Sequence, residues 1–261
     1  MGKIYDALER AIKPASNKKK LADESPILRS CKTSNGVIVP LNAHRQASAE
    51  KMMHSDLVAF HHPQSVEAEQ FKVLKTNLFF TARSKTPKII MVTSAVAGEG
   101  KSFVSCNLAV SIAQDDEEQV MLIDCNLRTP SVNRFFGFGS ATGWCRYLMK
   151  EFDISRYYIK NPVPKLTVLP AGTPPPNAAE LLTAKKIKSL LSEAMQRCEN
   201  GYIIIDSATP SLASETISIA SYVDGIIIVV KAGRTHRKDV TAVIDQLGRE
   251  KIVGIVMNNS D

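Results

Sequence analysis

The sequence reads Thr93-Ser-Ala-Val-Ala-Gly-Glu-Gly-Lys-Ser102 directly after the apolar run Lys88-Ile-Ile-Met-Val92. This stretch fits the pattern of a phosphate-binding loop between a buried strand and a helix, with Ala95 in place of the first glycine. Successive backbone N–H groups must turn inward around the phosphates, and Gly98 and Gly100 supply that freedom. The residues expected to contact a nucleotide are Ala97, Gly98, Glu99, Gly100, Lys101, Ser102 and Phe103.

Two side chains at the end of this loop bring the chemistry of phosphate binding. Lys101 would place a positive charge on the β- and γ-phosphate oxygens, and Ser102 would offer its hydroxyl to Mg²⁺. An amphipathic helix begins here and would aim the positive end of its dipole at the same phosphates. A glycine-containing turn that matches by chance is the alternative, but the strand before and the helix after the loop argue against it. The stretch predicts a nucleoside-triphosphate site.

Length, composition and charge set wide limits on the rest. The 261 residues suit one main domain with a full hydrophobic core. No apolar run approaches the roughly 20 residues that cross a bilayer, and the N-terminus lacks the apolar centre of a signal peptide, so we expect a cytoplasmic protein. Of the formal charge of +7, about four units fall within residues 1–60. This charge does not by itself indicate nucleic-acid binding; the basic arm suits a solvated tail, an anionic membrane surface or an acidic partner.

We divide the chain at residue 62. Apolar side chains at helical spacing predict a short amphipathic helix over residues 3–13, which either docks on a partner or lies on the main domain. The polar stretch that follows, up to His62, is broken by prolines and is predicted to be a flexible linker. Residues 1–62 thus form a basic N-terminal segment, and residues 63–261 form the predicted nucleotide-binding domain.

Strands and helices alternate through this domain. A helical pattern runs from Ser65 towards Ala82, and further helices are predicted over residues 178–198 and 238–247. Strands are predicted at residues 88–92, 120–124, 166–170, 202–206, 225–231 and 252–257. Continuous apolar strands separated by helices predict an α/β fold with a mostly parallel sheet and helices on both faces.

Two of the predicted strands end in aspartate, at Asp124 and Asp206. The carboxyl ends of parallel strands lie on the ligand side of such a sheet, beside the phosphate-binding loop. Together with Ser102, these carboxylates are the predicted ligands of Mg²⁺. Asp124 has a second possible role, as the base that accepts a proton from an incoming hydroxyl group. Either aspartate alone is a weak signal, but the pair together with the loop predicts phosphate transfer.

Four stretches within residues 65–261 resemble the bacterial tyrosine kinases of polysaccharide export, of the CpsD/CapB type. They are the phosphate-binding loop; Ile123-Asp-Cys-Asn-Leu-Arg-Thr-Pro130, which is similar to that family's Walker A′ motif; the strand that ends in Asp206, which is similar to its Walker B motif; and Leu169-Pro-Ala-Gly-Thr-Pro-Pro-Pro-Asn-Ala-Ala-Glu-Leu-Leu182. The last stretch is a highly specific match to the family's LPAGxxPPNPxELL segment.

The resemblance implies a P-loop NTPase with a MinD-like fold that binds ATP and Mg²⁺. It implies phosphate transfer to tyrosine, as a kinase or autokinase, in exopolysaccharide chain-length control and export. The catalytic residues that it implies are Lys101, Asp124, Arg128 and Asp206, and Asn258 is implied as a contact to adenine.

The resemblance also implies partners. Residues 69–77 are similar to the helix through which the family's subunits make contact, with Lys72 and Lys75 in place of two arginines. Glu69, Lys72 and Lys75 are therefore expected to mediate self-association, possible as a ring. A transmembrane chain-length regulator is the implied partner, and it would hold the chain at the inner face of the plasma membrane.

Three departures keep other functions open. Asn126 stands where the family's Walker A′ motif has its second aspartate, Ala97 replaces a proline that is frequent in the family's loop, and this sequence shows no tyrosine cluster at its C-terminal end. Tyr157 and Tyr158 are the more accessible candidate phosphate acceptors, with packing as the alternative, while Tyr202 and Tyr222 are expected to be structural. One alternative function is a regulatory ATP-binding scaffold with little kinase activity. Another is a positioning ATPase of the MinD/ParA type, which the absence of an extra lysine in the loop disfavours.

Overall fold

The computed structural model describes residues 31–32, 38–39, 53–80, 86–115, 118–139, 143–149, 153–160 and 162–258. The chain divides into two units, residues 1–44 and 45–261. In the first unit, β1 (Cys31–Lys32) pairs antiparallel with β2 (Ile38–Val39). The helix predicted over residues 3–13 lies outside the described residues, and the division of the chain at residue 62 stays a prediction. No helix in the described part of the chain has the length and apolar character to cross a membrane.

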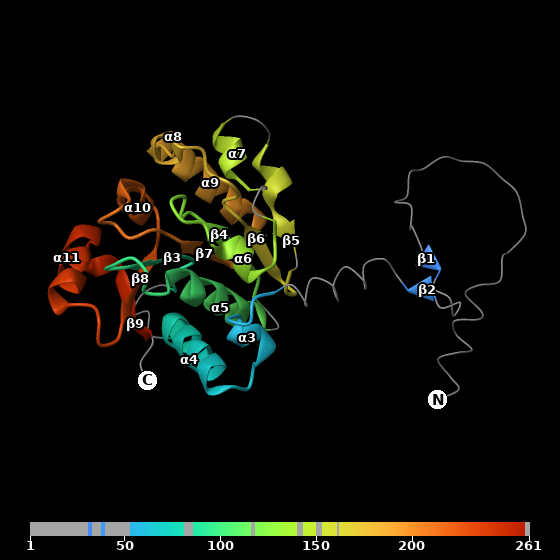
Figure 1. Cartoon of the computed structure of the whole chain (residues 1–261), viewed down its shortest axis with the longest axis horizontal. Helices are drawn as coiled ribbons and strands as arrows, with labels where there is room; N and C mark the ends of the chain where they lie inside the picture. Colours follow the sequence, from blue (N-terminus) through green and yellow to red (C-terminus); the bar gives the residue numbers. More distant parts are fainter. Residues whose placement is uncertain are drawn as a thin grey trace, which may run out of the picture. The chain divides into compact units, whose positions relative to one another are not determined.

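A seven-stranded sheet forms the centre of the second unit (Figure 1). Its order is β5-β6-β4-β7-β3-β8-β9, where β5 pairs antiparallel with β6 and all other pairs are parallel. The strands are β3 (Ile89–Ser94), β4 (Val120–Asp124), β5 (Ile159–Lys160), β6 (Leu166–Leu169), β7 (Tyr202–Asp206), β8 (Gly225–Lys231) and β9 (Ile252–Asn258). The predicted fold class is confirmed, and all six predicted strands are present.

Helices cover both faces of the sheet, and each face has its own buried cluster (Figure 1). One face packs against α3 (Val58–His61), α4 (Val66–Phe80), α5 (Lys101–Ala113) and α6 (Val132–Phe135). The other packs against α7 (Cys145–Leu148), α8 (Ala178–Leu181), α9 (Ala184–Arg197), α10 (Ser214–Ala220) and α11 (Arg237–Leu247), with the 3₁₀ turn η1 (Ile154–Tyr157). A second 3₁₀ turn, η2 (Arg249–Lys251), precedes β9. Because both faces are covered, the central strands must be apolar on both sides.

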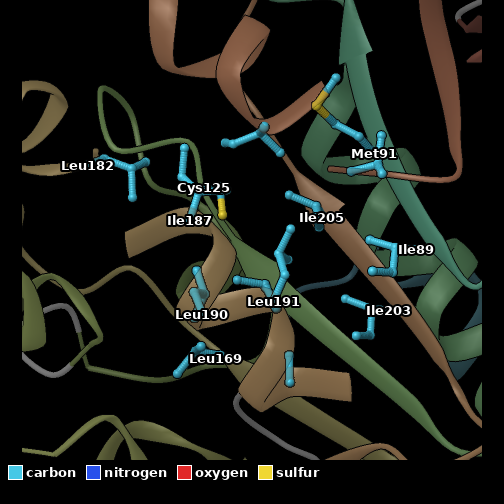
Figure 2. Close-up of a cluster of buried hydrophobic side chains, with 14 of the residues drawn as sticks. Ile89, Met91, Cys125, Leu169, Leu182, Ile187, Leu190, Leu191, Ile203 and Ile205 are labelled. Atoms are coloured by element: carbon cyan, nitrogen blue, oxygen red, sulfur yellow. The ribbon is translucent and has the colours of Figure 1, made fainter. Parts of the chain in front are cut away.

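Strand β7 shows how the sequence meets this requirement. Ile203 and Ile205 belong to the cluster under α9, whereas Ile204 belongs to the cluster under α5. In Figure 2, Leu190 and Leu191 of α9 lie near these two isoleucines of β7. Successive strand residues point to opposite faces, so an unbroken run of isoleucines is needed rather than an alternating pattern.

The helix predicted over residues 178–198 is two helices, α8 and α9. The break falls at Leu182 and Thr183, and the Thr183 hydroxyl oxygen accepts a hydrogen bond from the Lys186 N–H at 3.4 Å. Threonine side chains favour this position because they satisfy a first-turn N–H group that has no partner within the helix. Because the apolar residues keep helical spacing across residues 182 and 183, the sequence pattern predicted one continuous helix.

Residues 53–62 pack on the domain, although the sequence assigned them to the linker. Leu57 is fully buried, and the Asn107 side chain of α5 accepts from the Ala59 N–H at 2.9 Å and donates to the Asp56 carbonyl at 2.8 Å. The Gln114 amide donates to the Ala59 carbonyl at 2.7 Å. The predicted flexible linker therefore does not extend over residues 53–62.

Candidate active site

The phosphate-binding loop lies between β3 and α5, as predicted. Gly98 and Gly100 have φ angles of 82° and 92°, in the left-handed region that favours glycine. A Cβ on Gly100 would also lie 2.1 Å from the Asn258 amide nitrogen. The N–H groups in the first turn of α5 have no partners within the helix, which makes this end of α5 suitable for an anion.

Lys101 begins α5 and is 8% exposed. Burial lowers the pKa of its ammonium group, whereas the nearby carboxylates of Asp206 and Glu99 act in the opposite direction. The residue thus combines a buried positive charge with two acidic neighbours, before any phosphate is bound.

Asp206 is fully buried at the end of β7 and meets two serines of α5. The Ser102 hydroxyl donates to one carboxylate oxygen at 2.5 Å, and the Ser105 hydroxyl reaches the other at 3.2 Å. Burial raises the pKa of Asp206 to about 6, although these hydrogen bonds and Lys101 oppose the rise. The structure therefore brings together Lys101, Ser102 and Asp206. Ser105 was not predicted; its signal is the spacing of three from Ser102, which puts both hydroxyls on one helix face.

Asp124 lies opposite Asp206 in the register of β4 and β7 and is also fully buried. Its carboxylate accepts hydrogen bonds from three backbone N–H groups, those of Asn126 at 3.0 Å and of Ser131 and Val132 at 3.2 Å each. Burial and the charge of Asp206 raise its pKa well above the ordinary value. Three of roughly four acceptor positions are occupied, so there is room for one further contact, to a metal or to a proton donor.

The donor set suits Mg²⁺. Two neighbouring carboxylates, on Asp124 and Asp206, and the Ser102 hydroxyl are hard oxygen ligands, which this ion prefers. Two buried like charges are costly together unless a cation offsets them. No group of three or more His, Cys, Asp or Glu in the described chain could hold a metal by itself. Mg²⁺ is usually held by one or two carboxylates together with substrate phosphates.

The Glu99 side chain holds the phosphate-binding loop in place through hydrogen bonds. Its carboxylate is 2% exposed and accepts from the Val96 N–H at 2.7 Å, from the Lys231 N–H at 3.2 Å and from the Thr235 hydroxyl. The Asn258 side-chain amide donates to the Glu99 carbonyl at 2.9 Å. The sequence suggested that Glu99 contacts nucleotide; the structure shows that its side chain joins the loop to the end of β8. The contact of Asn258 with adenine stays a prediction.

The other predicted nucleotide contacts line two separate hollows. Ala97 and Gly98, with Lys231 and Arg234, line one of about 210 Å³. Phe103 packs on a phenylalanine of α4 and, with residue 258, lines another of about 750 Å³ between α4 and β9. The first part of the loop thus lines one hollow, and the first turn of α5 lines the other.

Arg128 lies in the segment after β4 and is half-exposed, with 50% of its side chain accessible. Its Nε atom is 3.5 Å from a carboxylate oxygen of Glu215, which lies in the first turn of α10. Glu215 was not singled out from the sequence. An acidic residue in a first helical turn is common, so the sequence offered no signal for it.

A family model and several known proteins match this chain. The family model described as an AAA domain matches residues 87–251. Tyrosine-protein kinase YwqD of Bacillus subtilis is 34% identical over 209 residues, which cover 79% of this chain and 86% of YwqD. The chain belongs to the bacterial tyrosine-protein kinase family.

Two further matches agree. Tyrosine-protein kinase CpsD of Streptococcus agalactiae is 34% identical over 193 residues, covering 73% of this chain and 82% of CpsD. The kinase domain of Escherichia coli tyrosine kinase ETK superposes with a TM-score of 0.70 at 25% identity, covering 78% of this chain and 82% of that one. The resemblance and the enzyme class inferred from the sequence are confirmed, and the positioning ATPase is not favoured.

The segment 169–182, the most specific kinase-like stretch of the sequence, is connected to Asp124 through Trp144. The Pro170 and Ala171 carbonyls accept from the N–H groups of Trp144 and Cys145, both at 3.0 Å. The Trp144 indole then donates to the Asp124 carbonyl at 2.7 Å. Trp144 is fully buried and is the single tryptophan of the sequence, the signal that could have drawn attention to it.

Asn126, at the position where the sequence resemblance implies an acidic residue, forms hydrogen bonds within its own turn. Its side-chain amide donates to the Thr129 carbonyl at 3.1 Å, and its side-chain oxygen accepts from the Thr129 N–H at 3.3 Å. The residue is buried. Whatever it contributes to a metal, it also closes the turn between β4 and α6.

The tyrosines of this kinase-family chain differ from expectation. Tyr157 is buried, and the phenol oxygens of Tyr157 and Tyr158 are both buried without a hydrogen-bond partner among the described residues. The prediction that this pair is accessible is therefore wrong; the segment around η1 packs on the cluster under α9. Tyr202 is buried as expected, whereas Tyr222 is 37% exposed and is the most accessible tyrosine that the structure describes.

Proposed function

We propose that this chain is an ATP-dependent protein-tyrosine kinase that acts in exopolysaccharide chain-length control and export. The observation that carries the proposal is that Lys101 and Ser102 lie beside Asp206. Asp124 lies in register with Asp206 on the neighbouring strand, and the chain belongs to the tyrosine-protein kinase family. Phosphate transfer relies on positioning and on offsetting negative charge, and these four residues supply both.

Each residue has a role in this proposal. Lys101 stabilises the charge on the transferring phosphoryl group, and the loop N–H groups hold the phosphates of ATP. Ser102, Asp206 and Asp124 hold Mg²⁺, which offsets phosphate charge when bound. Asp124 is alternatively the candidate acceptor of the tyrosine proton, because its one remaining acceptor position serves either the metal or that proton. Arg128 adds a second positive charge at the same edge of the sheet.

The surroundings of the kinase domain belong to the same proposal. Residues 1–62 form a basic N-terminal segment, of which residues 53–62 pack on the catalytic domain, and residues 63–261 carry that domain. A transmembrane chain-length regulator is the proposed partner, and through it the chain would lie on the cytoplasmic side of the plasma membrane. We propose no nucleic-acid partner, because the formal charge of +7 is modest for 261 residues.

The second candidate is a regulatory ATP-binding scaffold with little kinase activity. Asn126 favours it, because this amide lacks the charge of the family's acidic residue and is committed to a turn with Thr129. Purified full-length chain, incubated with γ-labelled Mg·ATP with and without the membrane partner, separates the two. Label on tyrosine supports the kinase. ATP turnover with no phosphotyrosine on any protein would leave the scaffold.

We expect Asn126→Asp to raise the rate of phosphotyrosine formation several-fold. The added carboxylate would hold Mg²⁺ or its waters more firmly. The same change removes the N–H donor to Thr129, so a small fall in melting temperature should accompany it. The rate is measured by the labelling assay and the melting temperature by calorimetry.

Gln196→Glu is the control for this change, because it makes the same amide-to-acid substitution at an exposed position of α9. Its labelling rate should equal that of the wild type. An Asn126→Asp variant that labels no faster would show that position 126 serves the turn and not the metal.

We expect the chain to self-associate through the exposed face of α4, and Glu69→Ala to weaken the oligomer. Glu69 and Lys72 form a solvent-accessible pair within the chain at 2.9 Å, whereas Lys75 is 2.7 Å from Asp115. Lys75 is thus paired within the subunit, and its part in self-association stays a prediction. Contacts between exposed charges weaken with salt, so the oligomer should dissociate at high ionic strength.

Sedimentation velocity at low and high salt measures this. Glu193→Ala is the matched control, because it removes a carboxylate from the comparable pair with Arg197 on α9. The control should sediment like the wild type. A monomer at every salt concentration would remove self-association through α4 from the proposal.

A further inference from the structure

Glu215 is a buried carboxylate that the proposed chemistry has not yet used. The residue is 3% exposed, and neither of its carboxylate oxygens has a hydrogen-bond partner among the described residues. A buried charge of this kind is unfavourable unless it is paired. Its one ion-pair partner in the described chain is Arg128, with Nε at 3.5 Å.

The position of Glu215 is fixed by its neighbours. The adjacent Thr216 hydroxyl donates to the Ala208 carbonyl at 3.0 Å, and the Thr93 hydroxyl of β3 donates to the same oxygen at 2.8 Å. These bonds tie the start of α10 to the end of the strand that leads into the phosphate-binding loop. Glu215 is therefore held at the start of a helix that is bonded to the segment following β7.

Arg128 differs, because half of its side chain is exposed and it comes from the loop after β4. Strands β4 and β7 are neighbours with Asp124 opposite Asp206, so the segments that follow them leave the sheet side by side. The pair of Arg128 and Glu215 bridges these two segments. The ion pair is made through Nε, and the planar fork of a guanidinium group matches phosphate oxygens.

We propose that Glu215 is a positioning residue that orients Arg128 toward the phosphoryl oxygens of the bound nucleotide. This inference rests on the proposed function and deepens it, since it assigns the orientation of one cation to a residue outside the four kinase-like motifs. An arginine on a flexible stem loses rotational freedom when it binds, and a fixed carboxylate beside Nε restricts that freedom in advance.

The test is a double-mutant cycle on the full-length chain with Glu215→Gln, Arg128→Ala and the double variant. Glu215→Gln keeps the shape of the side chain and removes a buried charge, so it should fold. It should lower kcat for phosphate release from Mg·ATP about tenfold and change KM for ATP less than about twofold. In the Arg128→Ala background, the same substitution should have no further effect on kcat.

A second readout uses no nucleotide. Arg128→Ala should lower the melting temperature of the ligand-free protein, because it leaves the buried Glu215 carboxylate unpaired. Adding Glu215→Gln should restore it. The matched control is the exposed pair of Asp245 and Arg249, where Asp245→Asn and Arg249→Ala should change neither kcat nor the melting temperature appreciably.

The outcomes separate this inference from the proposed function. Losses in kcat that multiply in the double variant, or a Glu215→Gln variant with unchanged kcat, would overturn the positioning role. Phosphate release without any phosphotyrosine would overturn the kinase and leave the cycle intact, because the cycle is measured on phosphate release. A wild type that does not turn over Mg·ATP would overturn both.

Discussion

Replacing Lys101 with alanine should lower Mg·ATP turnover about 10²–10³-fold while the protein stays folded. The ammonium group is the one cation placed at the start of α5, beside Ser102 and Asp206. Its removal takes away the charge that faces the β- and γ-phosphates, both in the bound state and in the transition state. Calorimetric titration with Mg·ATP should therefore show weaker binding, and the phosphate-release assay should show the loss of turnover.

The structure adds a condition to this experiment. Lys101 is buried before any phosphate is bound, and its charge partly offsets that of Asp206. The melting temperature of the ligand-free variant must therefore be recorded beside its activity. Lys188→Ala, on an exposed position of α9, is the control and should match the wild type in both. Unchanged binding and turnover in Lys101→Ala would contradict the phosphate-binding role of the loop.

The sequence predicted the sheet well because burial on both faces leaves a simple signal. The predicted strands at 120–124, 202–206 and 225–231 have the observed bounds of β4, β7 and β8. Local breaks were harder to predict. Thr183 divides α8 from α9 through a hydrogen bond that the apolar spacing does not reveal, and α3 is held by Asn107, which lies 48 positions from its partner Ala59.

Some residues of the candidate site could likewise be predicted from the sequence, and others could not. Lys101, Ser102 and Asp206 were predictable because motif spacing and strand ends place them together. Glu99 and Glu215 were not, because their roles depend on side chains that only the tertiary fold brings near, at Thr235 and Arg128. The prediction that Tyr157 and Tyr158 are accessible was wrong for a related reason. Their segment lies between sheet elements in the sequence, yet it packs on a helix from later in the chain.

Asp206→Asn should reduce Mg·ATP turnover by about 10² or more and, at the same time, stabilise the ligand-free protein at neutral pH. The loss follows because the variant removes a carboxylate from the proposed Mg²⁺ site beside Ser102. The gain follows because Asp206 is fully buried next to Asp124, so its charged form is unfavourable in the folded state.

The gain should depend on pH in a defined direction. Folding raises the pKa of Asp206 from its ordinary value of 3.8 to about 6. The folded state therefore holds this proton more tightly than the unfolded state, and the contribution to stability is complete below pH 4 and lost as the pH rises through about 6. The Asn variant has no such loss. Its advantage in free energy of unfolding should grow from pH 4 to pH 6 and level off above pH 7 at about 3 kcal/mol.

Denaturant unfolding of the ligand-free protein between pH 4 and pH 8 measures this difference. Asp245→Asn is the control, because Asp245 is exposed and pairs with Arg249 on the surface at 2.9 Å. Its unfolding free energy should stay within about 0.5 kcal/mol of the wild type at every pH. An Asp206→Asn variant less stable than the wild type at pH 8 would show that the hydrogen bonds from Ser102 and Ser105 outweigh the buried charge. One that retained turnover would remove Asp206 from the metal site.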